Sequence, residues 1–120
     1  MQTSSFATAR KTMVDCQLRP SKVTDQFILD AFLTIPREDF VGKQQRAMAY
    51  VDEDLPLFGG RCLMEPMVLA RLLQALEIRP DDSVLIVGAG CGYGTAVAAK
   101  LAGSVIAIET RANLVHKAQD

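Results

Sequence analysis

Over about its first 80 residues the chain spaces its apolar positions as helices do, and it then changes to short continuous apolar runs. Residues 6–18 are compatible with a helix that ends before Pro20, because proline disfavours α geometry in the residue before it. Asp25 is expected to cap the start of a second helix, which ends at Pro36. The apolar stripe of that second helix consists of Ile28, Leu29, Phe32 and Leu33.

The middle of the chain predicts shorter elements. Residues 36–40 are expected to form a helical turn, and residues 50–60, which mix acids, Pro56 and two glycines, an irregular connection. Residues 61–64 are a candidate strand, and Pro66 suits the first turn of a stronger helix. A core-facing stripe on this helix is predicted at Leu69, Leu72, Leu73 and Leu76.

From residue 84 the pattern is that of a strand, a turn, a helix and a second strand. Residues 84–87 and 105–108 are apolar and rich in β-branched types, as expected of strands that are buried on both faces. Residues 95–101 between them favour a helix that ends at Gly103. Together they make one βαβ unit with parallel strands and a right-handed crossover, and a further helix is expected from Arg111.

These elements predict an α/β chain with two parts, a helical region over 1–80 and a first βαβ part over 81–120. Two parallel strands are too few for a doubly wound sheet that is covered on both faces. We therefore expect either a piece of a longer protein or self-association through the incomplete sheet. The absence of a cap or breaker before Asp120 favours the first alternative.

Composition excludes several kinds of partner. Apolar residues make up 49% and charged residues 22%, which is an ordinary balance for a folded soluble domain. A net charge of −1 offers no cationic surplus for nucleic acid, and no apolar run approaches the ~20 residues that span a bilayer. We expect no nucleic-acid or membrane partner and a cytoplasmic location. Three dispersed cysteines and one histidine predict reduced thiols and no metal site.

Four glycines lie between the first predicted strand and its helix: Gly88, Gly90, Gly92 and Gly94. Glycines there allow a tight turn and let a ligand approach the backbone, although a tight turn without a ligand is the alternative. A dinucleotide fingerprint would need a small residue where Tyr93 or Thr95 stands, and the Gly-Lys-Ser/Thr ending of a phosphate-binding loop is absent. The G-x-G-x-G spacing of residues 88–92 resembles the first motif of class I methyltransferases.

Glu109 follows the second predicted strand and lies 21 positions after Gly88. A carboxylate in this place can accept hydrogen bonds from both hydroxyls of a ribose, which suits nicotinamide cofactors or S-adenosylmethionine. Taken alone, Glu109 would be a solvated charge at a strand end. Its coincidence with the glycine turn favours a nucleoside ligand, so that 81–120 is expected to begin a cofactor-binding domain.

Several further segments sharpen this interpretation. In order and spacing the chain resembles protein-L-isoaspartate O-methyltransferases from about Met13 onward, through residues 13–19, 35–41, 49–52 and 55–57, Pro66 and the glycine turn. The resemblance implies a Rossmann-like S-adenosylmethionine methyltransferase fold, of which only the N-terminal helical region and the first βαβ unit are present. It also implies methyl transfer to the free carboxylate of L-isoaspartyl residues in damaged proteins, which is a repair reaction.

The resemblance further implies site residues. The cofactor-binding residues would be Gly88, Ala89, Gly90, Gly92, Tyr93, Glu109 and Thr110. The glycine turn would wrap the methionine and ribose portions, Glu109 would hold the ribose, and Thr110 would lie beside the adenosine. No catalytic residue is assigned, because a carboxyl with a pKa near ~3.9 is already ionised at neutral pH and needs no general base. Without the later strands, residues 1–120 alone are expected to be inactive.

The chain departs from the family pattern in two places. Family members usually carry a Ser-x-Pro-His-like segment before the long helix, where this chain has Met64, Glu65, Pro66 and Met67. Ile86 stands where typical members carry an acid that orients the ammonium end of the cofactor. Two alternatives therefore stay open, a methyltransferase with another acceptor and a non-catalytic binding or assembly module. A nicotinamide oxidoreductase is disfavoured by the glycine spacing.

Overall fold

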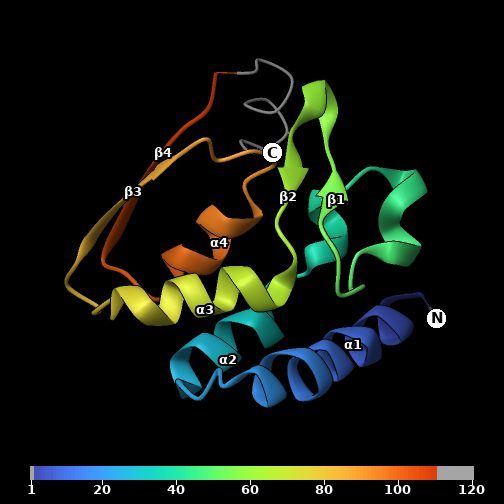
Figure 1. Ribbon diagram of the computed structural model, residues 1–120, viewed down its shortest axis with the longest axis horizontal. Helices are drawn as coiled ribbons and strands as arrows, with labels where there is room; N and C mark the ends of the chain where they lie inside the picture. Colours follow the sequence, from blue (N-terminus) through green and yellow to red (C-terminus); the bar gives the residue numbers. More distant parts are fainter. Residues whose placement is uncertain (1, 111–120) are drawn as a thin grey trace.

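The computed structural model describes residues 2–110, and its first element is a long helical segment that crosses the base of the molecule (Figure 1). Helix α1 (Gln2–Met13) continues into a π-helical stretch, η1 (Val14–Leu18), and a 3-10 turn, η2 (Arg19–Ser21), that contains Pro20. Met13, Val14 and Leu18 are buried on its inner face. The predicted first helix is confirmed, and it begins earlier than the apolar pattern indicates.

Helix α2 (Gln26–Thr34) starts as predicted, because the carboxylate of Asp25 accepts a hydrogen bond of 2.9 Å from the backbone N–H of Phe27. The helix ends at Ile35, whose backbone is extended ahead of Pro36. The predicted stripe is buried at Ile28, Leu29 and Phe32, whereas Leu33 is half-buried.

Helix α3 (Pro66–Leu76) begins at proline, as predicted, but only part of the leucine stripe is buried: Leu73 is buried and Leu69 is partly buried against the core. Leu72 and Leu76 are 51% and 64% exposed, so the prediction is wrong at these two positions. The fully buried Ala70 lets the helix approach its neighbours closely there. The buried face therefore runs through Pro66, Ala70 and Leu73 and turns the two outer leucines toward solvent.

Short elements connect α2 to α3. They are η3 (Arg37–Phe40), η4 (Lys43–Met48), β1 (Leu55–Pro56), η5 (Phe58–Gly60) and β2 (Cys62–Leu63). Strands β1 and β2 pair in antiparallel fashion, with Leu55 opposite Leu63. The predicted turn after Pro36 and the strand at 61–64 are confirmed. The partner strand, β1, lies inside the segment 50–60 that the sequence predicts to be irregular. The prediction misses it because Pro56 and the acids before it are not typical of a strand.

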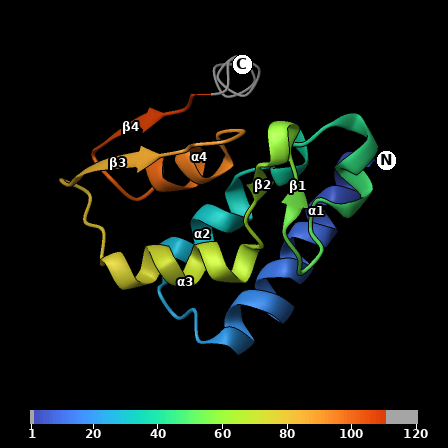
Figure 2. The same cartoon turned by 45° about the horizontal axis from the view of Figure 1, so that its top comes forward.

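The second layer is the βαβ unit, built from β3 (Ser83–Val87), α4 (Tyr93–Ala99) and β4 (Ser104–Ile108). The two strands are parallel, as predicted, and they pair from Ser83 opposite Ser104 to Val87 opposite Ile108. Helix α4 lies between this sheet and the layer of α2 and α3 (Figure 2). The further helix expected from Arg111 lies outside the described residues.

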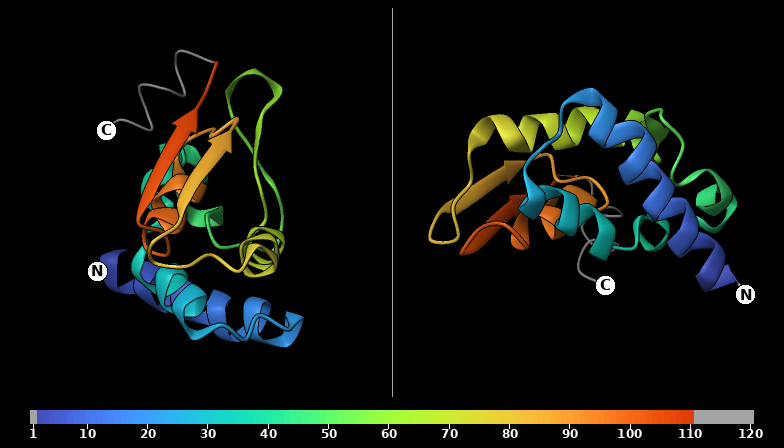
Figure 3. Two further views of the ribbon diagram at one scale, coloured as in Figure 1. Left: turned by 90° about the vertical axis from the view of Figure 1, so that its left-hand side faces the viewer. Right: turned by 90° about the horizontal axis from the view of Figure 1, so that it is seen from below.

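One face of the β3–β4 sheet is bare, whereas both faces were expected to be buried. Leu85, Val87, Ile106 and Ile108 are 60%, 76%, 65% and 48% exposed. Side chains alternate along a strand, so the residues between them turn to the other face, on which α4 lies (Figure 3). Within residues 2–110 no element covers the bare face, and the expectation of two buried faces is wrong for this part of the chain.

A single core joins the two layers. Tyr93 at the start of α4 is fully buried and makes edge-to-face contacts with Phe32 of α2 and Phe40 of η3, at 6.1 and 5.6 Å between ring centroids.

Among the described residues, no helix is both long and apolar enough to cross a membrane.

Gly103 offers a test of how tightly the βαβ unit closes. Its N–H donates to the Asp82 carbonyl at 2.9 Å, and an added Cβ would lie 2.7 Å from the Pro80 carbonyl oxygen. Both neighbours are backbone, so Gly103→Ala is expected to lower the free energy of unfolding by about 2 kcal/mol. Urea unfolding checks this value. Gly42→Ala is the matched control, because no atom lies within 4 Å of the added Cβ, and equal losses in both variants would contradict the prediction.

Candidate functional site

The glycine turn between β3 and α4 is fastened to the end of β4. Gly88, Gly90 and Gly92 have φ values of 73°, 62° and 93°, a region that side-chain-bearing residues rarely adopt. The N–H groups of Gly88 and Ala89 both donate to the Ile108 carbonyl, at 2.8 and 3.0 Å. The turn therefore lies directly beside the residue that follows Ile108.

That residue is Glu109, and its carboxylate points at the turn. Oε1 accepts a hydrogen bond of 2.7 Å from the N–H of Gly90, and the side chain is only 4% exposed. A buried carboxylate requires strong partners, since its desolvation is otherwise unfavourable. The spacing between Gly88 and Glu109 thus corresponds to a real juxtaposition in space.

The second partner of Glu109 comes from the β1–β2 hairpin. Arg61 makes a bidentate ion pair, in which Nη1 donates to Oε2 and Nη2 to Oε1, each at 2.7 Å. The same Nη2 lies 2.9 Å from the position that a Cβ on Gly88 would occupy. The guanidinium is therefore seated against the bare backbone of the turn.

The other predicted site residues lie in different surroundings. Ala89 is half-buried in the turn, and Thr110 is exposed directly after Glu109. The side chain of Tyr93 is fully buried in the core, where its hydroxyl has no hydrogen-bond partner among the described residues. Burial raises the pKa of this hydroxyl. Tyr93 as a whole is 0% exposed, so neither its side chain nor its main chain reaches the surface of the turn.

A buried arginine, Arg37, packs against Tyr93 at the end of the glycine turn. Arg37 is fully buried, and its side chain donates from Nε to the Ala49 carbonyl at 2.6 Å and from Nη2 to the Met64 carbonyl at 3.0 Å. The guanidinium carbon lies 4.8 Å from the centroid of the Tyr93 ring, a cation–π contact. Burial lowers the pKa of Arg37. One arginine thus ties η3, the segment before α3 and the start of α4 together.

A polar network next to Arg37 fixes η3 to α1. The Tyr50 hydroxyl donates to Glu38 and accepts from Arg10 Nε at 2.8 Å and from the Arg37 N–H at 3.0 Å. Arg10 also pairs with Glu38 at 3.1 Å. Burial raises the pKa of Tyr50 to about 12, so the phenol stays protonated and keeps donating to the carboxylate over the ordinary pH range.

The segment that departs from the family pattern lies at the start of α3. Met64 is 37% exposed, and the N–H of Glu65 donates to Asp54 at 2.8 Å. A hydrogen bond to Asp52 raises the pKa of Glu65. Glu65 is the residue before the first helical turn but makes no side-chain cap. The region around Met64 is consequently acidic, whereas Ile86, at the other departure, is half-buried in apolar surroundings.

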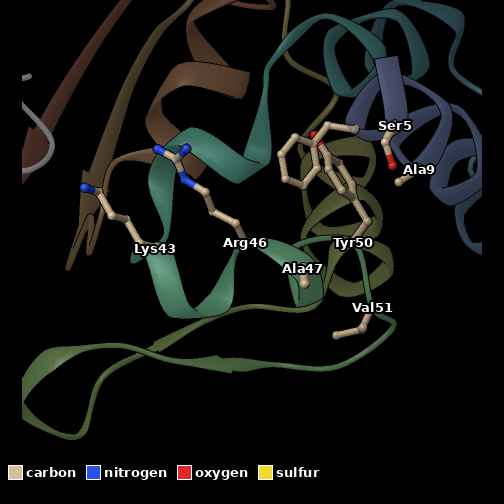
Figure 4. A pocket seen from close by; sticks show the side chains of 8 residues that line it. Ser5, Ala9, Lys43, Arg46, Ala47, Tyr50 and Val51 are labelled. Carbon is tan, nitrogen blue, oxygen red and sulfur yellow. The ribbon is translucent and has the colours of Figure 1, made fainter. Parts of the chain in front are cut away.

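A separate cavity of about 640 Å³ lies between α1 and η4 (Figure 4). Phe6 and Ala9 line it from α1. Lys43 and Arg46 line it from η4, and their side chains extend in the same direction. Tyr50 forms part of its wall. None of the predicted cofactor-binding residues lines this cavity, so it is distinct from the glycine turn.

Sequence reasoning missed the two arginines. Arg61 meets Glu109 across 48 positions of sequence, and no local pattern connects a hairpin residue to a strand end so far away. Arg37 lies in the segment 35–41 that carries the family resemblance, yet nothing in its sequence neighbourhood indicates full burial. An arginine between apolar and acidic neighbours ordinarily indicates an exposed turn.

Two solved structures resemble this fold closely. A protein-L-isoaspartate O-methyltransferase superposes with a TM-score of 0.79 at 27% identity, covering 92% of this chain and 37% of that one. A structure from Plasmodium falciparum, named for the same activity and solved with S-adenosyl-L-homocysteine, gives a TM-score of 0.77 at 21% identity, covering 92% and 53%. The predicted Rossmann-like methyltransferase fold, present in part, is confirmed.

Sequence comparison agrees with the fold. A protein-L-isoaspartate O-methyltransferase of Koribacter versatilis (strain Ellin345) is 41% identical over 116 residues, which are 97% of this chain and 52% of that protein. A second, from Anaeromyxobacter sp. (strain Fw109-5), is 43% identical over 111 residues, which are 92% and 46%. The chain spans about half the length of the curated relatives it matches. Because the family's sequence model also matches residues 8–120, the chain belongs to the protein-L-isoaspartate(D-aspartate) O-methyltransferase family.

Proposed function

We propose that the full-length protein carrying this sequence transfers a methyl group from S-adenosylmethionine to the carboxylate of L-isoaspartyl residues in damaged proteins. The observation that supports this most directly is the contact between Glu109 and the N–H of Gly90, at 2.7 Å. This contact supports a role for Glu109 as the acceptor for ribose hydroxyls, because the carboxylate lies beside a turn whose glycines carry no Cβ. Membership of the family supplies the reaction type.

The residues present fit the adenosyl part of such a donor. Glu109 has the charge and position to accept from the ribose, and Gly88 and Gly90 present backbone without a Cβ in the way. Thr110, exposed directly after Glu109, would lie beside the adenine. Tyr93, which is 0% exposed, would support the turn from within the core. Ile86 supplies no charge for the ammonium end of the donor, which must be bound by other groups.

The chemistry requires little from the protein beyond placement. When bound, S-adenosylmethionine supplies a methyl group that is already activated by the positive sulfur. The isoaspartyl carboxylate is ionised at neutral pH and needs no general base. The task of this chain is to hold the donor by its adenosyl end in one orientation, and such orientation contributes about 7–11 kcal/mol to a reaction of this kind.

The direct test is transfer of labelled methyl groups by the full-length protein. We expect an isoaspartyl peptide to be labelled and the same peptide with a normal aspartyl residue to stay unlabelled. Prior calorimetry with S-adenosylhomocysteine establishes whether the donor site binds at all. Binding without selective labelling would reject the repair reaction while keeping the donor site, and absence of binding would reject the methyltransferase assignment itself.

A second candidate function keeps the donor and changes the acceptor. It is favoured by Met64 and Met67, which replace a polar pair, and by the acids Asp52, Asp54 and Glu65 beside Met64. Like charges at short range disfavour an anionic acceptor. Under this alternative the full-length protein would bind S-adenosylhomocysteine but methylate neutral or cationic acceptors in a lysate in preference to the isoaspartyl peptide.

A further inference from the structure

Arg61 occupies the part of the site that an adenosyl ligand would need. Its two terminal nitrogens donate to both oxygens of Glu109 at 2.7 Å, and Nη2 lies against Gly88. This inference rests on the proposed function, because it concerns how the same carboxylate would receive a ribose.

The acceptor capacity of the Glu109 carboxylate defines the conflict. An ionised carboxylate offers about two acceptor positions on each oxygen. Oε1 already accepts from the Gly90 N–H and from Arg61 Nη2, and Oε2 accepts from Arg61 Nη1. A ribose that donates from two hydroxyls needs two positions, and at most one is left. The bidentate pair and a ribose therefore cannot be bound at the same time.

Space leads to the same conclusion. A methyl-sized group on Gly88 would already lie 2.9 Å from Arg61 Nη2, so the guanidinium covers the bare backbone by which a ligand would approach. Departure of the arginine would uncover this surface and vacate the acceptor positions on Glu109 that the guanidinium now fills.

The two partners differ in how readily they can leave. The side chain of Glu109 is 4% exposed and is anchored to the turn, whereas that of Arg61 is 30% exposed and reaches water. Arg61 also follows Gly59 and Gly60, with φ values of 71° and 78°, in a hairpin of only two residue pairs. The arginine is thus the movable member of the pair.

We propose that Arg61 sets the affinity of this site: it neutralises Glu109 in the free protein and is displaced when an adenosyl ligand binds. A ligand that must displace a competing group binds more weakly, by the free energy of the contact that it breaks. Arg61 therefore opposes binding.

Calorimetry on the full-length protein tests the proposal, with S-adenosylhomocysteine as the probe. Arg61→Gln is expected to bind about tenfold more tightly than the wild type, since hydrogen bonds between charged groups have this order of strength. Arg61→Lys, which keeps the charge but loses the bidentate geometry, should fall between the two. Arg71→Gln removes an exposed charge from α3 and is the matched control, with unchanged affinity.

The outcomes separate the two proposals. Equal or weaker binding by Arg61→Gln, with the wild type binding, would overturn the displacement and leave the donor site in place. Binding by Arg61→Gln where the wild type shows none would support displacement strongly. Absence of binding by the wild type and by both Arg61 variants would overturn the proposed function, and the displacement with it.

Discussion

Replacing Glu109 by glutamine is expected to lower the affinity of the full-length protein for S-adenosylhomocysteine about 100-fold, or about 2.7 kcal/mol. The carboxylate of Glu109 offers two acceptor oxygens to the ribose, and one of them also accepts from the Gly90 N–H. The amide of glutamine offers only one oxygen, and its NH₂ group would face the ribose hydroxyls or the Gly90 N–H, which are donors themselves. Hydrogen bonds to a charged group contribute about 1.5–3 kcal/mol each. Glu109→Gln also weakens the ion pair with Arg61 that a ligand would have to displace, and this favours binding. The expected loss of binding free energy is therefore smaller than the sum of two such hydrogen bonds.

Calorimetry measures this change, and two further variants define its cause. Glu53→Gln removes an exposed acid elsewhere and should leave affinity unchanged. Glu109→Asp keeps the charge but shortens the side chain, so it should also bind weakly if position decides the affinity. A thermal melt of each protein verifies folding. Affinity within threefold of the wild type for a folded Glu109→Gln protein would show that this acid does not hold the ligand.

The second large effect is expected at Arg37, where methionine should lower the free energy of unfolding by about 3 kcal/mol. The substitution leaves the buried carbonyl of Ala49 and the part-buried carbonyl of Met64 without their donors, at about 1–3 kcal/mol for a fully buried group and less for the second. It also removes the cation–π contact with Tyr93. The desolvation of a buried charge is relieved at the same time, which lowers the sum.

Urea unfolding followed by circular dichroism measures the loss at Arg37. Arg46→Met is the matched control, because Arg46 is exposed on η4, and we expect a change below about 0.5 kcal/mol there. If Arg37→Met proved as stable as that control, the arginine would not be what joins η3 to the glycine turn.

The parts of this fold that the sequence predicts well are those with local causes. Asp25 caps a helix through its own side chain, and the glycine turn follows from residues within a few positions of one another. The contact between Glu109 and the turn can also be predicted from the sequence, because two parallel strands bring their carboxyl ends to the same edge of the sheet. Local spacing is enough to predict such contacts.

The parts that the sequence could not predict depend on packing between distant segments. Leu72 has the spacing of a core residue, but α3 buries the face that carries Ala70 and Leu73 and leaves Leu72 exposed. Arg61 and Arg37 are placed by the hairpin and by the Tyr93 ring, and both depend on the completed tertiary structure. The roles of the individual cofactor-binding residues stay predictions until a ligand is bound.

The bare face of the β3–β4 sheet has a practical consequence for laboratory work with residues 1–120. Four large aliphatic side chains stand together there, Leu85, Val87, Ile106 and Ile108, each about half exposed or more. A contiguous patch of this kind attracts amphiphilic dyes, chaperones and other copies of itself. A preparation of residues 1–120 alone would be handled best at low concentration or with mild detergent. Ligand-binding assays on it would detect non-specific hydrophobic adsorption as well as specific binding.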